Sequence, residues 1–266
     1  MKKITIFAIL FISITFSSQG QDVGKWRAGS PFKLTGGVYT LTCFVSRPDE
    51  EWAYDAKIKK LNVLKENQEW IKTQALKYGF SVDFSESGHL GLKEDIKLPS
   101  IESGTGSGKE PVNLVSQVLY KAGYKSTLDL FDWVKHHTKA ENLQVIIFAK
   151  GQGRGYSMAS SSAMNKEKYF VEGTVLYETS TSGKESSTSA IAHEILHLYG
   201  AWDLYKTFCQ TAENEKKARE LFPNSVMLKV SNNLNSLEVD KVTAWRIEWN
   251  NEPEEWYESF RGDCRQ

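Results

Sequence analysis

Apolar residues recur along the chain with two different periods, which predict strands and helices in a mixed order. In residues 38–46 every second residue from Tyr39 to Val45 is apolar, so this segment is expected to be a strand. Residues 49–78 carry apolar side chains at spacings of three, four or seven, the pattern of a long amphipathic helix. Similar but shorter patterns predict strands at residues 80–84, 143–149, 156–160 and 171–178, and helices at residues 112–122 and 127–138. This order is typical of an α+β (α/β-like) domain with a twisted, mostly parallel sheet.

One short apolar segment contains the polar residues with the clearest chemistry. His193 and His197 lie four residues apart, so a helix places both imidazoles on one face. Two neutral imidazoles at this spacing can bind one zinc ion, and Glu194 between them can hold a water molecule on the metal. Nearly every other residue from 190 to 199 is apolar, which predicts a buried helix rather than a solvated polar patch. Because an unpaired buried polar group costs about 1–3 kcal/mol, these three side chains need a partner, and a metal ion satisfies all of them. The serines and threonines of residues 180–189 are expected to cap this helix.

Gly200 and Asp203 follow His197 at intervals of three residues. The complete run, H-E-x-x-H-x-x-G-x-x-D, resembles the zinc signature of the metzincin clan of metalloendopeptidases. It has the Asp-ended form of a minority that includes the small secreted snapalysin-type enzymes. The resemblance implies that Asp203 is the third metal ligand, where most of the clan has His. Gly200 is expected to form the helix-ending turn, because glycine adopts the positive φ of such a turn without strain.

The resemblance extends, less specifically, over residues 36–250. It implies a methionine-containing turn beneath the metal, and Met227 stands in the corresponding place downstream. Met227 can equally be core filler, because methionine packs irregular gaps well. Residues 238–247 have the pattern of a helix and lie where the clan has its C-terminal helix. Some members place a metal-reaching tyrosine two residues after the methionine, but that residue is Lys229 here, so none is expected.

The resemblance also implies where a substrate binds. In the clan an extended substrate lies antiparallel to an edge strand beside the zinc helix, and an edge strand offers unpaired backbone groups for such pairing. By order along the chain, this antiparallel edge strand is the segment at residues 156–160. The expected substrate-binding residues are therefore Tyr156, Ser157, Met158 and Ala159. The alternative is an ordinary covered strand.

Together these residues predict a secreted zinc-dependent endopeptidase that hydrolyses peptide bonds. One Zn²⁺ held by the two histidines and Asp203 would keep a fourth position open for water, and Glu194 would act on that water as general base. The expected partner is a protein or peptide substrate. Imidazole and carboxylate ligands favour zinc but admit other divalent metals.

Two other classes of protein can use the same residues. The first is a zinc-dependent hydrolase of a non-peptide amide, such as a cell-wall linkage. The second is a non-catalytic secreted zinc-binding protein, whose binding surface would include Trp245, Trp249 and Trp256. Packing in the core is the alternative for these tryptophans. Glu194 disfavours the second class, because a purely structural metal site needs no base at that position.

The N-terminus has the pattern of a signal peptide over residues 1–20. A short basic region at Lys2 and Lys3 precedes an apolar stretch at residues 4–16, and small residues follow it. The stretch is shorter than the roughly 20 residues that span a membrane, so no membrane anchor is expected, with an uncleaved signal anchor as the alternative. The chain is thus expected to be exported, either secreted or periplasmic. The remainder, residues 21–266, is expected to be a single metzincin-like catalytic domain with its cleft near residues 193–203 and a C-terminal subdomain from about residue 204.

Charge and cysteine content narrow the partners. The 33 basic and 33 acidic residues cancel, and without a basic block nucleic acid is not an expected partner. A monomer is expected. Cys43 falls on the apolar face of the first predicted strand and is read as a buried thiol. Because export permits disulfides, Cys209 and Cys264 are the candidate pair.

Overall fold

The structure is a computed structural model, and it describes residues 29–31, 33–101, 109–159, 171–207 and 210–262. The expected signal peptide at residues 1–20 and the candidate disulfide partners Cys209 and Cys264 lie outside the described residues.

The described helices and strands follow one another in an alternating order. They are β1 (Gly36–Ser46), α1 (Tyr54–Lys77), β2 (Val82–Leu90), β3 (Ile96–Lys97), α2 (Lys109–Lys121), α3 (Thr127–His137), β4 (Asn142–Gln152), β5 (Tyr156–Met158), β6 (Gly173–Thr179), α4 (Ala190–Leu198), α5 (Ala212–Leu221) and α6 (Lys241–Arg246). Short 3₁₀ helices cover Leu234–Ser236 and Glu255–Arg261.

The strands form one mixed sheet in the order β2-β1-β4-β6-β5, with β3 pairing against the end of β1. Strands β2, β3, β4 and β6 run parallel to their neighbours, while β5 runs antiparallel to β6 and forms one edge. The expected fold class, a mostly parallel sheet with an antiparallel edge strand, is therefore confirmed.

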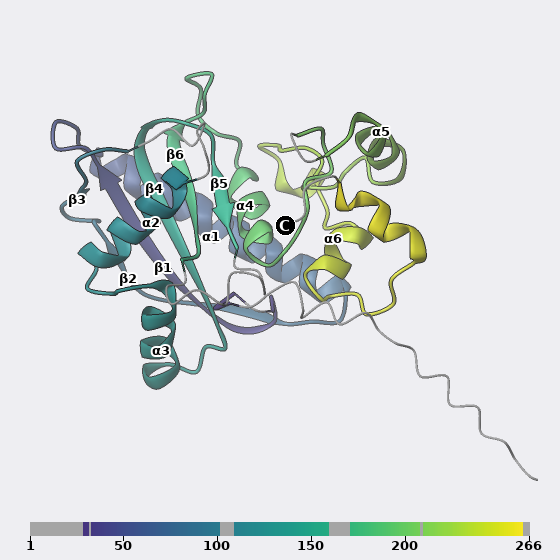
Figure 1. Ribbon diagram of the computed structural model, residues 1–266, viewed down its shortest axis with the longest axis horizontal. Coiled ribbons are helices and arrows are strands. Elements are labelled where there is room, and N and C mark those ends of the chain that lie inside the picture. Colours follow the sequence, from purple (N-terminus) through teal and green to yellow (C-terminus); the bar gives the residue numbers. More distant parts are fainter. Residues whose placement is uncertain (1–28, 32, 102–108, 160–170, 208–209, 263–266) are drawn as a thin grey trace, which may run out of the picture.

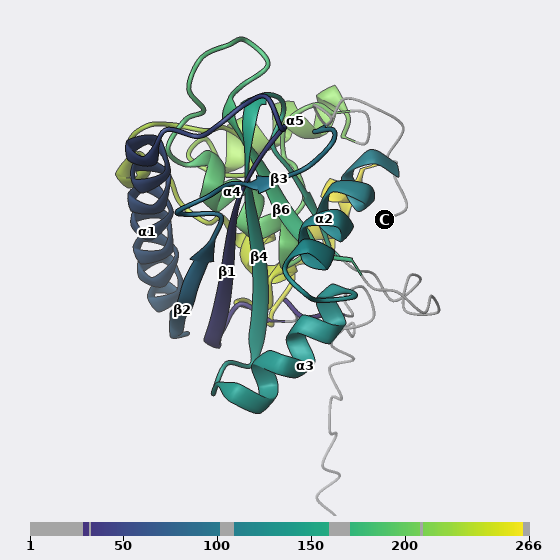
Figure 2. The same cartoon turned by 90° about the vertical axis from the view of Figure 1, so that its left-hand side faces the viewer.

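Helices cover both faces of the sheet. Figure 2 shows α1 on one side and α2 with α3 on the other, and α4 contacts α1 on the first side. Alternating residues of the central strands feed two separate hydrophobic cores. Phe44 and Phe148 stack on the α1 side with ring centroids 5.2 Å apart, whereas Cys43, Ile147 and Val118 are buried on the α2 side. Cys43 is a free buried thiol, as expected, and burial raises its pKa to about 12.

The chain after α4 extends the core on the α1 side (Figure 1). Trp245 and Trp249 are each only 2% exposed. The indole nitrogen of Trp249 donates to the carbonyl of Leu34 at 2.6 Å, and the half-buried Trp256 stacks on Phe222. These tryptophans pack within the protein, which removes the observation that favoured a tryptophan-lined binding surface.

Three of the differences from the sequence-based expectation have a clear physical reason. The first long helix begins at Tyr54 rather than residue 49, because Trp52 is buried with its backbone nitrogen bonded to Asp95 at 2.9 Å. Strand β2 continues to Leu90 rather than ending at residue 84. Its second half consists mostly of polar residues, so the alternation of apolar and polar side chains that marks a strand is missing there. Helix α5 was not expected, and its only buried residue is Ala218, so it has no apolar stripe to reveal it.

Among the described residues, no helix combines the length and the apolar character needed to cross a membrane.

Candidate metal centre

Helix α4 carries the histidine motif and is buried on nearly all sides. Its buried residues are Ile191, Ala192, His193, Glu194, Ile195, Leu196 and Leu198. The burial expected from the sequence is confirmed, and it comes from the position of α4 between the sheet and the C-terminal region (Figure 1).

The start of α4 is capped from another helix. The expectation that a preceding Ser or Thr side chain caps it is wrong for the N-cap residue Ser189, whose side chain makes no capping bond and instead accepts from the backbone of Ser231 at 2.8 Å. The side chain of Asn67 on α1 accepts from the backbone nitrogen of Ala192 at 3.0 Å and donates to the carbonyl of Thr188 at 2.9 Å. A buried amide thus anchors the motif helix to α1.

Gly200 ends the helix as expected. Its φ is +95°, a conformation in which an L side chain is strained. The backbone nitrogen of Gly200 donates to His197 at 3.0 Å, and that of Ala201 donates to Leu196 at 3.1 Å. This turn reverses the chain and brings Asp203 back to the two histidines.

The structure brings the three expected metal ligands together. The Nε2 atom of His197 lies 3.1 Å from Nε2 of His193 and 3.2 Å from Oδ1 of Asp203. The third side of this triangle, from His193 Nε2 to Asp203 Oδ1, is 3.3 Å. Among the described residues, this is the group of His, Cys, Asp and Glu side chains that could hold a metal ion.

The hydrogen bonds of the two imidazole rings determine which nitrogen of each ring carries the proton and which has a lone pair for a metal ion. Nδ1 of His193 contacts the carbonyl oxygen of Val226 at 3.0 Å, and Nδ1 of His197 contacts that of Ala201 at 2.8 Å. A carbonyl oxygen only accepts, so each Nδ1 carries the proton and, in a neutral ring, each Nε2 offers a lone pair. Two lone pairs and one carboxylate oxygen therefore converge without a donor, an arrangement that needs positive charge from either a metal ion or an added proton.

The pKa values of the metal-free side chains agree with this requirement. Burial alone lowers the pKa of His197, but its hydrogen bond to Asp203 and the charges of Asp203 and Glu194 raise it to about 9. Burial alone raises the pKa of Asp203, yet the bonds from both imidazoles hold it well below its usual range. Without a metal, a proton on the imidazole supplies the missing positive charge.

A zinc ion fits the triangle. Ligand atoms about 2.0–2.1 Å from a tetrahedral zinc ion lie about 3.3–3.4 Å from one another, and the three edges here are 3.1–3.3 Å. Two imidazoles and one carboxylate are also a donor set that zinc accepts. The residues therefore fit a zinc centre in both spacing and chemistry.

Glu194 points from the same helix toward the edge of the sheet. Its Oε2 lies 3.0 Å from Oγ of Ser157 on β5. A Cβ atom added to Gly155 would lie 3.4 Å from its other oxygen, Oε1, so Gly155 lies beside the carboxylate. The glutamate is nearly buried, with 9% of its surface exposed.

Met227 lies in a tight turn that contacts His193 and the residue that follows Asp203. The turn is closed by a hydrogen bond from Leu228 to Ser225 at 3.1 Å, and Met227 is fully buried. The carbonyl of Met227 accepts from Leu204, the residue after the Asp203 ligand, at 2.9 Å. Since Val226 accepts from the ring of His193, this turn supports the ligands from two directions, and Met227 also fills the core.

The expected substrate strand lies at the sheet edge next to α4. Strand β5 pairs antiparallel with β6, and Ala159 follows its last residue. Tyr156 and Met158 pack against the core on the α2 side, whereas Ser157 reaches α4. Binding of substrate by these residues stays a prediction.

Two residues near the centre were not found from the sequence. The ring of Tyr205 lies 6.0 Å from that of His193, and its hydroxyl accepts from Arg154 at 3.2 Å. Burial, together with the charge of Asp203, raises the pKa of Tyr205 to about 12, so the hydroxyl keeps its proton at neutral pH. The one feature of the sequence that could have pointed to Tyr205 is its position two residues after Asp203.

The remaining histidines lie elsewhere. His136 and His137 are exposed at the end of α3, where each Nδ1 contacts a carbonyl one turn earlier, at 2.6 and 2.7 Å. His89 lies 3.5 Å from Glu86 on β2. Among the described residues, none of these three histidines belongs to the group that could hold a metal ion.

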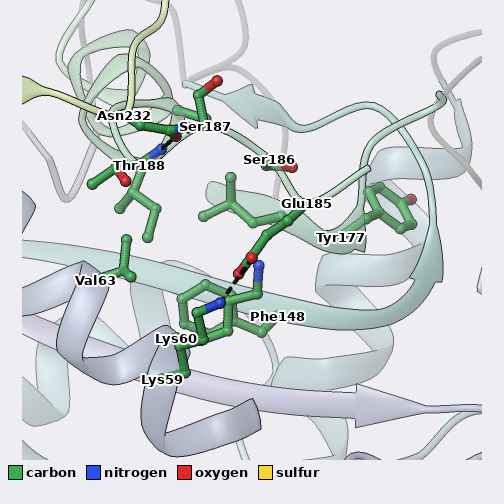
Figure 3. A pocket seen from close by; sticks show the side chains of 13 residues that line it. Lys59, Lys60, Val63, Phe148, Tyr177, Glu185, Ser186, Ser187, Thr188 and Asn232 are labelled. Carbon is green, nitrogen blue, oxygen red and sulfur yellow. Dashed lines mark hydrogen bonds and ion pairs between the residues drawn. The ribbon is translucent and has the colours of Figure 1, made fainter. Parts of the chain in front are cut away.

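A cavity of about 210 Å³ lies near the start of α4 (Figure 3). An ion pair of 2.8 Å between Lys59 and Glu185 stands at one side of it. Other lining residues are Lys60, Val63, Phe148 and Thr188. The described residues that line this cavity include none of the three metal ligands, so it is separate from the metal centre.

Comparison of the chain with protein-family models, with curated proteins and with solved structures found no match.

Proposed function

We propose that this protein is an exported zinc-dependent endopeptidase of the metzincin type. The observation that carries the proposal is the convergence of two imidazole lone pairs and one carboxylate oxygen within 3.1–3.3 Å, on a buried helix that also presents Glu194. A structural metal site would be closed by a fourth protein ligand. Among the described residues the group has three, which is the number typical of catalytic zinc.

Zinc bound by these residues would act as a Lewis acid, lowering the pKa of a water molecule and polarising the carbonyl of the bond to be cleaved. Glu194 would accept the proton of the attacking water and pass it to the leaving amine, as general base and then general acid.

Two further groups suit the charge that develops in peptide hydrolysis. As the carbonyl oxygen of a peptide becomes negative, a donor that keeps its proton stabilises it. Tyr205 has such a hydroxyl, and Arg154 adds a positive charge next to it. Strand β5 leaves one edge of the sheet unpaired among the described residues, and an extended peptide can pair with that edge.

The proposal is tested with the exported protein and two variants. Glu194→Gln removes the base, and Glu213→Gln on the exposed face of α5 is the matched control. Each is assayed for bound metal by atomic emission and for cleavage of denatured protein, with and without a chelator. We expect one zinc per chain in all three and cleavage by wild type and control. The rate of cleavage by Glu194→Gln should be about 10²- to 10⁴-fold lower than that of wild type, because general base catalysis contributes a factor of this size.

A wild-type protein that holds one zinc but cleaves no protein substrate would contradict the proposal. The same samples are then assayed on cell-wall amides. Chelator-sensitive release there would favour the amide hydrolase, and inactivity on both would favour a zinc-binding protein.

A further inference from the structure

Ser157 on the edge strand touches the carboxylate of Glu194. Its Oγ lies 3.0 Å from Glu194 Oε2 and 2.6 Å from the backbone carbonyl oxygen of the same residue. It also lies 2.8 Å from the hydroxyl of Thr174 on β6. Among the described residues, the hydrogen bond to the Glu194 carboxylate that the structure records comes from this serine.

The hydrogen bonds of Ser157 form a short chain that ends at Glu194. A serine hydroxyl has one proton to donate and two lone pairs to accept. Thr174 can donate to Ser157, because the contact permits either direction, and the one serine proton is then shared between the backbone carbonyl of Glu194 at 2.6 Å and its carboxylate at 3.0 Å. Thr174 lies directly opposite Ser157 in the β5–β6 register and is itself fully buried, so the chain starts from a fixed position in the sheet.

The contact between Ser157 and Glu194 restricts a glutamate side chain that is otherwise long and flexible. It has three rotatable bonds, and a base must be held in productive geometry to act efficiently. Helix α4 fixes only the Cα atom of Glu194. The contact with Ser157 fixes the far end of the side chain from a different element.

We propose that Ser157 is a positioning residue, which orients the Glu194 carboxylate and connects it to the strand where substrate would bind. This inference rests on the proposed function, in which Glu194 is the base and β5 the substrate edge. Because Ser157 belongs to β5, a peptide pairing with that strand would pack beside the same residue that holds the base. This positioning role depends on the hydroxyl of Ser157, whereas pairing of the β5 backbone with substrate does not.

The test compares Ser157→Ala, which removes the hydroxyl, with Ser157→Thr, which keeps it and suits a strand. Ser85→Ala is the matched control, because Ser85 lies on β2 at the opposite edge of the sheet and its hydroxyl donates only weakly to Val38 at 3.4 Å. The measurements are kcat and KM on a peptide, bound zinc, melting temperature, and the crystal structures of wild type and Ser157→Ala.

We expect Ser157→Ala to lower kcat by about 10- to 100-fold with little change in KM, as is common when a group that orients a reactive residue is lost. Ser157→Thr should recover most of this activity, and Ser85→Ala should behave as wild type. All variants should keep their zinc. In the Ser157→Ala crystal the Glu194 carboxylate should adopt a different orientation.

Each of the following results would overturn the proposal. A kcat for Ser157→Ala within about threefold of wild type would show that the hydroxyl does not position the base. A rise in KM at constant kcat would assign Ser157 to substrate binding, and loss of zinc would assign it to the integrity of the metal centre. If wild type cleaves no peptide, the proposed function has failed, and the crystal structures alone decide about Ser157. An unchanged Glu194 orientation in Ser157→Ala then rejects the inference.

Discussion

The Nδ1 atom of His193 donates a hydrogen bond to the backbone carbonyl of Val226 at 3.0 Å. This bond joins the motif helix to the methionine turn and leaves Nε2 of the same ring free to bind a metal. Bonds of this kind set the orientation and basicity of a ligating histidine. The acceptor is a backbone atom, so its position depends on what holds the turn in place.

Asp240 holds that turn, and its removal should weaken both stability and metal binding. One carboxylate oxygen accepts from Ser225 at 2.6 Å, and the other caps α6 through Val242 and Thr243, both at 2.9 Å. Asp240→Ala therefore loses a helix cap and leaves buried donors unpaired, which together should cost about 2–3 kcal/mol. Urea unfolding measures the loss, and zinc affinity should fall by about tenfold.

Asp132→Ala is the control for this variant. Asp132 forms an exposed ion pair with Lys135 on α3, so its loss should change stability by less than about 0.5 kcal/mol. Equal zinc affinity in wild type and Asp240→Ala would contradict the support assigned to the turn.

Gly200→Ala should reduce metal affinity beyond its effect on stability. The φ of +95° strains an alanine by about 1–2 kcal/mol, and the turn can relieve that strain by moving Asp203 away from the histidines. Gly79→Ala is a matched control, because Gly79 has a φ of +79°, an added Cβ would meet no atom within 4 Å, and the residue lies just after the end of α1. Both variants should unfold at lower urea, but only Gly200→Ala should bind zinc more weakly. Identical affinities in competition with a chromogenic chelator would count against this role of the turn.

Tyr205→Phe should slow peptide cleavage without loss of metal. The hydroxyl keeps its proton at neutral pH, and the Tyr205 ring lies 6.0 Å from that of His193, so the hydroxyl is a candidate donor to a developing oxyanion. Removal of one such donor costs about 10²- to 10³-fold in kcat. Tyr120→Phe, at an exposed site on α2, should leave kcat unchanged. Wild-type kcat in Tyr205→Phe would remove this residue from the mechanism.

The buried ion pair between Lys57 and Asp95 should make stability depend on pH. The two charged atoms lie 2.6 Å apart, with side-chain exposures of 2% and 0%. Lys57→Met leaves the buried carboxylate with the more distant and half-exposed Lys97 at 3.8 Å, and should cost about 3 kcal/mol at neutral pH.

The sign of the pH effect follows from the pKa of Asp95. Burial raises that pKa, but hydrogen bonds from Lys57, Ser46 and Trp52 and the charge of Lys57 lower it on balance. A carboxyl group with a lowered folded pKa stabilises the protein above its unfolded pKa of about 3.9, and this contribution is lost as the pH falls through the folded value. The gap in unfolding free energy between wild type and Lys57→Met should therefore narrow below about pH 4. A gap independent of pH would contradict the pairing.

The sequence predicted the parts of the fold whose signals are local. The apolar alternation of β1 and the apolar surroundings of His193 each lie within one short segment, and both elements form as expected. Helix α5 escaped notice because a helix with one buried residue has no periodic stripe. The cap of α4 was misassigned because Asn67, which supplies it, is 125 residues away from Ala192 along the chain.

In the candidate site, too, the residues that the sequence predicted are those with a local signal. His193, Glu194, His197 and Asp203 form one contiguous pattern that can be read directly. The resemblance placed Ser157 on an edge strand beside this helix, but its contact with Glu194 and that of Arg154 with Tyr205 depend on how β5 folds against β6, which no spacing in the sequence encodes.

The metal ligands all lie within residues 193–203, whereas Asn67 and Val226, which hold their helix and orient a ring, come from distant parts of the chain. An unfolded chain therefore already contains a complete, if loose, chelating peptide. Metal captured in that state reduces the net stabilisation that zinc gives to the native protein. On the proposed function, metal uptake could thus precede folding, and high affinity would develop as α1 and the methionine turn pack around the three side chains.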